Sequence, residues 1–209
     1  MSHTIQLENN EGNAIPPNVG ANAVKVCAHI TIGGNHSARV CDIVTKISLA
    51  VSDFAKSDIK LTSVSRFFTT PCFPVGAGPD FVNAAVSVNW TGTADSLLQA
   101  LHKIEAQHGR ARTRRWGQRT LDLDLIAVGS TLVPDLAEFV QWRDLCPEQQ
   151  RIKAPVRLIL PHPRLQDRAF VLVPLCDIAA EWCHPVSGLS VRQMCDALPP
   201  DDIGAIRPL

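Results

Sequence analysis

The chain has 209 residues, 45% of them hydrophobic, with 20 basic and 20 acidic side chains. This length and composition allow a buried core and exclude wholesale disorder. The zero net charge removes the global argument for a nucleic-acid binder, and the chain has no apolar run of about 18 residues to suggest a membrane span. Its 7 cysteines form no Cys-x-x-Cys pair, so we expect small buried thiols in a reducing, cytoplasmic compartment.

The first half of the chain alternates predicted strands and a helix. Residues 1–23 are polar and rich in Asn, Gly and Pro, and we expect a mobile tail ahead of a single domain over 24–209. Alternating apolar residues predict a strand from Val24 to about 32, which ends at the turn Gly33-Gly34-Asn35. The next expected elements are a helix over 40–54, a strand over 59–68 and a Pro- and Gly-rich loop over 69–80.

The second half continues this pattern and then weakens. Period-two alternation predicts a strand over 81–90, an apolar stripe predicts a helix over 97–104 that Gly109 stops, and a strand follows near 121–125. The order βαββαβ predicts an α+β, ferredoxin-like fold, in which helices pack on an antiparallel sheet. We expect an insertion near 133–157, with a helical turn or two, and a C-terminal extension that holds an apolar run at 170–175 and a helix over 191–198.

The stretch Trp116 to Asp124 carries the strongest chemical signal. Asp122 and Asp124 occupy alternate strand positions and should share one face, while the leucines between them point into the core. Adjacent carboxylates repel each other and attract a cation, although a solvated strand edge gives the same pattern. Arginines crowd the preceding loop: Arg110, Arg112, Arg114, Arg115 and Arg119. Because guanidinium groups match phosphate oxygens and Mg²⁺ bridges carboxylate to phosphate, we expect a metal-bound polyphosphate here.

Several motifs, in order, carry a resemblance to a known family. They are Gly33-Gly34-Asn35, Thr70-Pro71, the segment 80–85, the segment 110–124, and Pro161-His162 followed by Arg168. Together they resemble the 6-hydroxymethyl-7,8-dihydropterin pyrophosphokinase family. The resemblance implies transfer of diphosphate from ATP to the pterin hydroxymethyl group with release of AMP, two Mg²⁺ ions, and a role in folate biosynthesis. Gly34 and Gln118 depart from the usual family residues, but neither change removes a charge or a metal ligand.

The resemblance also implies roles for individual residues. Asp122 and Asp124 would hold the metal and, with Arg110 and Arg119, form the catalytic set. The implied ATP-binding positions are Glu105, Arg112, Arg119, His162 and Arg168. The implied pterin-binding positions are Thr70, Pro71, Phe73, Phe81, Asn83, Trp116 and Phe170. Aromatic rings can sandwich a flat pterin, and an amide can recognise its polar edge, although a phenylalanine can equally be an ordinary core residue.

The expected partners are ATP and the pterin, without nucleic acid or membrane. We expect a monomer, and a contact with other folate enzymes stays open. One alternative is an RNA-binding module that uses the arginine patch, but its sheet should expose several aromatic residues. Another is a family member that binds ATP without catalysis. The sequence contains no G-x-x-x-x-G-K-[ST] stretch, which excludes an ordinary P-loop kinase.

Overall fold

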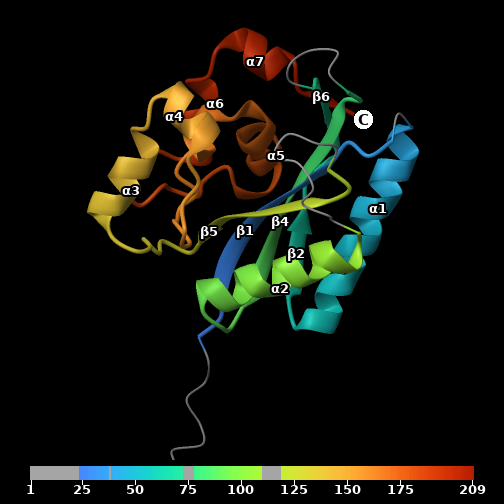
Figure 1. The fold of residues 1–209 in the computed structure, drawn as a ribbon, viewed down its shortest axis with the longest axis horizontal. Coiled ribbons are helices and arrows are strands. Elements are labelled where there is room, and N and C mark those ends of the chain that lie inside the picture. The colour runs from blue at the N-terminus through green and yellow to red at the C-terminus, as the bar shows by residue number, and fades with distance from the viewer. Residues whose placement is uncertain (1–23, 38, 73–77, 110–118) are drawn as a thin grey trace, which may run out of the picture.

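A computed structural model describes residues 24–37, 39–72, 78–109 and 119–209, and its centre is an antiparallel sheet (Figure 1). The strands lie in the order β5-β1-β4-β3-β6, and β2 also pairs with β4. Their bounds are β1 (Val26–Gly34), β2 (Lys60–Val64), β3 (Phe68–Thr70), β4 (Phe81–Trp90), β5 (Asp122–Val128) and β6 (Arg207–Pro208). The expected ferredoxin-like core is confirmed, because β5, β1, β4 and the β2/β3 pair follow its strand order.

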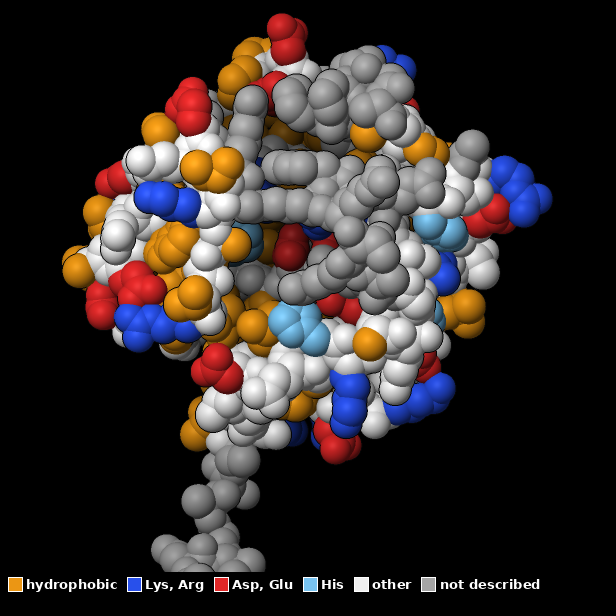
Figure 2. Space-filling model, in the orientation of Figure 1, with side chains coloured by type: hydrophobic (Ala, Val, Ile, Leu, Met, Phe, Trp, Pro, Cys, Tyr) orange, Lys and Arg blue, Asp and Glu red, His pale blue; other side chains and the backbone are white. Residues whose placement is uncertain are grey.

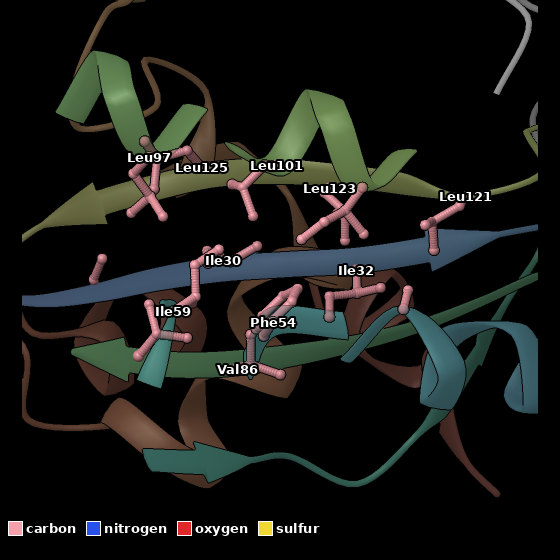
Figure 3. Close-up of a cluster of buried hydrophobic side chains, with 14 of the residues drawn as sticks. Ile30, Ile32, Phe54, Ile59, Val86, Leu97, Leu101, Leu121, Leu123 and Leu125 are labelled. Atoms are coloured by element: carbon pink, nitrogen blue, oxygen red, sulfur yellow. The ribbon is translucent and has the colours of Figure 1, made fainter. Parts of the chain in front are cut away.

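Two helices, α1 (Val40–Ser52) and α2 (Ala94–Gln107), pack on one face of this sheet. Figure 3 shows Leu97 and Leu101 of α2 over β5, and Ile30 and Ile32 of β1 in the same cluster. The core on this face draws alternate residues from each strand, as the period of two requires. Thr93 caps α2 through its hydroxyl, and Gly109 follows with a φ of 81°, as its predicted stop role requires.

The opposite face is covered by C-terminal helices, so the structure has three layers. The apolar run at 170–175 lies in α5 (Ala169–Ala179), which packs with α6 (Val191–Asp196) against Ala85 and Ile126 of the sheet. The remaining helices are α3 (Leu136–Arg143), α4 (Pro147–Ile152) and α7 (Pro200–Gly204), with 3-10 turns η1 (Asp53–Ser57) and η2 (Leu165–Asp167). Within the described ranges, none of these helices is long and apolar enough to cross a bilayer.

The strand predicted over 59–68 is broken, which corrects the sequence reading. β2 ends at Val64 and β3 begins at Phe68. Between them the Ser65 hydroxyl accepts the backbone N–H of Ala85 at 2.8 Å, in the place of a strand carbonyl. The Arg66 backbone N–H and guanidinium both bind Asp177 of α5. These side-chain bonds redirect the backbone, an effect that strand propensity does not encode.

A buried histidine in β1 gives the fold a predictable pH response. His29 is 5% exposed, shares a 2.9 Å hydrogen bond with Ser87 Oγ, and lies edge-on to the Trp182 ring. Burial lowers the pKa of His29 to about 4. The unfolded chain therefore binds more protons between pH 6.5 and about 4, so stability must fall as the pH drops through this window.

We expect His29 alone to account for a loss of up to about 3 kcal/mol in unfolding free energy by pH 4. Urea unfolding at pH 7 and pH 4.5 measures the loss, and His29→Gln, which keeps a partner for Ser87, should make it smaller. An equal loss in wild type and variant would contradict this assignment.

Candidate active site

The two carboxylates of β5 belong to a row of residues that crosses the sheet. Asp122 is the register partner of Gly33 in β1, Gly33 is the partner of Asn83 in β4, and Asn83 is the partner of Phe68 in β3. Asp124 lies opposite Thr31, one step along the same face. The leucines before, between and after the aspartates are buried in the core under α1 and α2. The carboxylates therefore stand side by side on the other face, as the period of two predicts.

Asn35 fixes the position of Arg119, the first described residue before β5. The Asn35 backbone N–H donates to the Arg119 carbonyl at 2.9 Å, and the Arg119 N–H donates to Asn35 Oδ1 at 2.8 Å. Asn35 Nδ2 donates to the Pro79 carbonyl at 3.2 Å. Arg119 in turn forms an ion pair with Asp122, whose side chain is 13% exposed. The turn after β1 therefore positions both charged groups.

Removing the Asn35 side chain should destabilise the protein by about 1–3 kcal/mol, because Asn35→Ala removes the side-chain partners of the part-buried Arg119 N–H and Pro79 carbonyl. Asn35→Asp keeps the oxygen that accepts from Arg119 and should lose less. Urea unfolding at pH 7 compares the two, and an Asn35→Ala variant as stable as wild type would show that water replaces these bonds.

Gly33 leaves the space in which the Asn83 amide lies. Asn83 is 8% exposed, and its Nδ2 donates to Thr70 Oγ1 at 2.8 Å. A Cβ atom at Gly33 would overlap Asn83 Oδ1. Phe81 is the register partner of Thr70 and shares the strand face of Asn83. Three predicted pterin-side residues are thus brought together, and Pro71 follows them, exposed, at the end of β3.

A cavity of about 690 Å³ opens beside the carboxylates, and Arg119, Asp124, His162 and Arg168 line it. Figure 2 shows acidic side chains near the centre of this face, with histidine side chains close by. Arg164 also lines the cavity, although sequence reasoning missed it. Asp122 does not line the cavity, but it forms an ion pair with Arg119, which does line it. Four predicted nucleotide or catalytic residues therefore meet in one hollow.

His162 is held as a neutral hydrogen-bond donor. Its backbone N–H donates to the Ile126 carbonyl at 2.7 Å, and its Nδ1 accepts the Arg164 N–H at 3.1 Å. The proton of the neutral ring must then lie on Nε2. Burial, reinforced by Arg168, lowers the pKa of His162 to about 4, while Asp124 opposes the shift. At neutral pH the ring can donate one hydrogen bond without adding a charge.

Arg168 supplies a partly buried positive charge to the same hollow. Its guanidinium lies over the Phe170 ring, 5.5 Å from the centroid. Burial lowers the pKa of Arg168, whereas the nearby Asp124 raises it. The guanidinium stays charged at neutral pH. Phe170 itself is half-buried between two hydrophobic clusters, so it supports Arg168 whether or not a ligand contacts it.

Glu105 lies behind the carboxylate strand. It is 2% exposed, and its Oε1 accepts the backbone N–H of Leu123, the residue between the two aspartates, at 2.7 Å. Glu105 is not one of the residues that line the cavity, so its predicted role in ATP binding stays a prediction. The other predicted site residues, Phe73, Arg110, Arg112 and Trp116, lie outside the described residues.

The carboxylate pair suits Mg²⁺ only as part of a larger ligand set. Among the described residues, no group of three or more His, Cys, Asp or Glu side chains could form a protein-only metal cage. Mg²⁺ is usually held by one or two carboxylates, with substrate phosphates and waters completing its octahedron. Asp122 and Asp124 fit this arrangement if a polyphosphate occupies the adjoining cavity.

Comparison with known proteins identifies the family of this chain. The model of the 7,8-dihydro-6-hydroxymethylpterin-pyrophosphokinase (HPPK) family matches residues 29–180. The chain belongs to the HPPK family. Two relatives are named 2-amino-4-hydroxy-6-hydroxymethyldihydropteridine pyrophosphokinase. The Synechocystis relative is 32% identical, and the match covers 81% of this chain and 74% of the relative. The Haemophilus influenzae relative is 30% identical, and the match covers 82% of this chain and 94% of the relative.

Solved structures in the family share the fold at low identity. The HPPK-DHPS protein of Plasmodium falciparum, in a triple mutant crystallised with SDX-DHP, superposes with a TM-score of 0.59 at 14% identity. The match covers 84% of this chain and 44% of that one, so this chain spans less than half of the Plasmodium protein. This similarity supports the HPPK fold alone.

Proposed function

We propose that the protein transfers diphosphate from ATP to the hydroxymethyl group of 6-hydroxymethyl-7,8-dihydropterin, releasing AMP, in folate biosynthesis. Membership of the HPPK family and the names of its relatives support this activity. The observation that carries the proposal is the row from Asp122 through Gly33 to Asn83, which sets a candidate pterin-recognition amide two strands away from a candidate metal carboxylate.

The pterin would lie on the sheet face formed by Thr70, Phe81 and Asn83. An aromatic ring such as Phe81 offers a flat apolar surface to a flat heterocycle. The Asn83 amide carries both a donor and an acceptor for the polar edge of the ring, and its bond to Thr70 fixes which way it points. The reacting hydroxymethyl group can then be directed across β1 toward the carboxylates of β5.

The triphosphate would lie in the cavity beside β5. The hydroxymethyl oxygen forms a bond to the β-phosphorus, and the bond from that phosphorus to the oxygen shared with the α-phosphorus breaks, so AMP leaves and the hydroxyl proton is released. Arg119 and Arg168 offset the phosphate charge, and His162 Nε2–H donates to a phosphate oxygen. Asp122 and Asp124 would hold two Mg²⁺ ions, which supply Lewis-acid neutralisation of the polyphosphate when bound.

A coupled assay of AMP release tests the proposal. The protein is incubated with ATP and Mg²⁺, with and without 6-hydroxymethyl-7,8-dihydropterin. We expect AMP only when the pterin is present. ATP binding without AMP formation would indicate a family member that has lost catalysis, and release of ADP would indicate transfer of a single phosphate; either result would overturn the proposal.

A further inference from the structure

The segment 134–159, here called the α3–α4 segment, is an excursion closed at its base. Val133 and Leu160 flank it and exchange two backbone hydrogen bonds, of 3.0 and 2.9 Å. It leaves the sheet after β5 and returns just before His162, at the mouth of the cavity. Figure 1 shows α3 and α4 standing together beside the sheet, away from α1.

Specific contacts hold the α3–α4 segment in place. Phe139 is fully buried and lies 5.5 Å from the His184 ring, which in turn contacts Trp182. Glu138 makes two hydrogen bonds to Arg157 across the segment, and Asp135 caps α3 through its side chain. Arg157 lowers the pKa of Glu138, and a hydrogen bond with Trp142 adds to this effect. The segment is therefore a packed wall.

This wall forms the outer side of the cavity. The residues that it contributes are Trp142, Leu145, Gln150, Lys153, Ala154, Pro155, Val156, Arg157, Leu158 and Ile159. Asp95, Leu98, Gln99 and His102 of α2 also line the cavity, whereas Arg119, Asp124, Arg164 and Arg168 supply charge on the side of the sheet, beside the neutral His162. The side of the hollow away from the sheet thus combines apolar side chains with the amides of Gln99 and Gln150 and the charged Asp95, Lys153 and Arg157.

A nucleoside triphosphate can match both sides of this hollow. Its phosphates need cations and metal, while its base offers flat apolar faces and a polar edge. If the phosphates lie beside Asp124 and Arg168, the nucleoside must extend from there along the remaining cavity wall. Two large apolar side chains on that wall are Trp142, which lies in α3, and Leu145, which follows the end of α3.

We propose that the α3–α4 segment forms part of the nucleotide site and contacts the base and ribose, with Trp142 and Leu145 as residues that determine affinity for the nucleoside. This inference rests on the proposed function, because it takes the nucleotide to be ATP. Trp142 packs its indole against the base, and Leu145 extends the apolar surface. Neither residue contacts the phosphates.

Comparing two ligands on three variants tests the inference. Isothermal titration in Mg²⁺ measures the affinities of ATP and of inorganic triphosphate for wild type, Trp142→Ala, Leu145→Ala and the control Leu136→Ala. Leu136 lies in the same helix, is 52% exposed and does not line the cavity. We expect Trp142→Ala to weaken ATP binding about 10-fold and Leu145→Ala to weaken it about 3-fold. The affinity for triphosphate should not change in any variant.

Two results would overturn the inference: ATP affinity equal to wild type in both cavity variants, or an equal loss for ATP and triphosphate. Leu145→Ala keeps the test decisive if Trp142→Ala does not fold. The two hypotheses can fail separately, because binding needs neither pterin nor turnover. A wild-type protein that binds ATP but forms no AMP would contradict the proposed function, whereas an active wild type with unaffected variants would contradict the α3–α4 inference alone.

Discussion

Replacing Asp124 or Asp122 by asparagine is expected to lower pterin-dependent AMP formation by about 10³-fold while the protein stays folded. Asparagine keeps the size of the side chain but removes the charge that would hold Mg²⁺ against the triphosphate. Asp122 and Asp124 share one strand face and repel each other, but Asp122 also pairs with Arg119, so Asp122→Asn loses this ion pair while it removes the repulsion. Activity should therefore fall far more than stability.

Turnover and melting temperature, each with and without MgATP, measure the two effects separately. Wild type should gain thermal stability on adding MgATP, and the Asp122→Asn and Asp124→Asn variants should gain much less. Asp201→Asn, an exposed carboxylate in α7, serves as the control and should behave like wild type. Equal gains by wild type and by the β5 variants would show that these carboxylates do not hold the metal.

Adding one methyl group at Gly33 is expected to weaken pterin binding about 100-fold or more. The Cβ atom would overlap Asn83 Oδ1, so the amide must rotate and lose its hydrogen bond to Thr70. Overpacking of this kind also costs about 1–3 kcal/mol of stability. Binding is measured by titration with the pterin, and Gly204→Ala is the control, because no atom lies within 4 Å of a Cβ atom at that position.

A double-variant cycle isolates the cause of this effect. In an Asn83→Ala background the methyl group has room, so Gly33→Ala should cost at least about 1 kcal/mol less stability than it does in wild type. Pterin binding should stay weak in the double variant, because the recognition amide is absent. If Gly33→Ala costs the same stability in both backgrounds, the contact with Asn83 is not the reason for the glycine.

The elements with clear periodicity were predictable from the sequence. The alternation in β1 and β4 and the apolar stripe of α2 gave the strand order, and the leucines around Asp122 gave the face of the carboxylates. The break between β2 and β3 was not predictable, because it depends on the Ser65 hydroxyl and on Asp177, which is 111 residues from Arg66. β6, with only two residues, carries no periodic signal.

The site was predictable to the extent that its residues lie in contiguous motifs. Asp124, His162 and Arg168 line one cavity, as their resemblance to the family implied they should. The role of Asn35 was missed, although the Gly-Gly-Asn turn was visible, because its partner Arg119 lies 84 residues away. The cavity contacts of Trp142 and Leu145 depend on how the α3–α4 segment folds back, which no local pattern in the sequence records.

The position of α2 determines where this protein can tolerate changes in length. Within one helical turn, His102 faces the cavity and Glu105 holds the backbone between the two aspartates. Each residue of an α-helix turns it by about 100°, so inserting or deleting one residue between them would move one of these side chains out of place. In the α3–α4 segment, the bonds between Val133 and Leu160 close the base, so an inserted residue would disturb contacts within the segment, such as Glu138 with Arg157, but would leave this closure in place. Across the family, chain length should therefore vary after β5 and stay constant within α2.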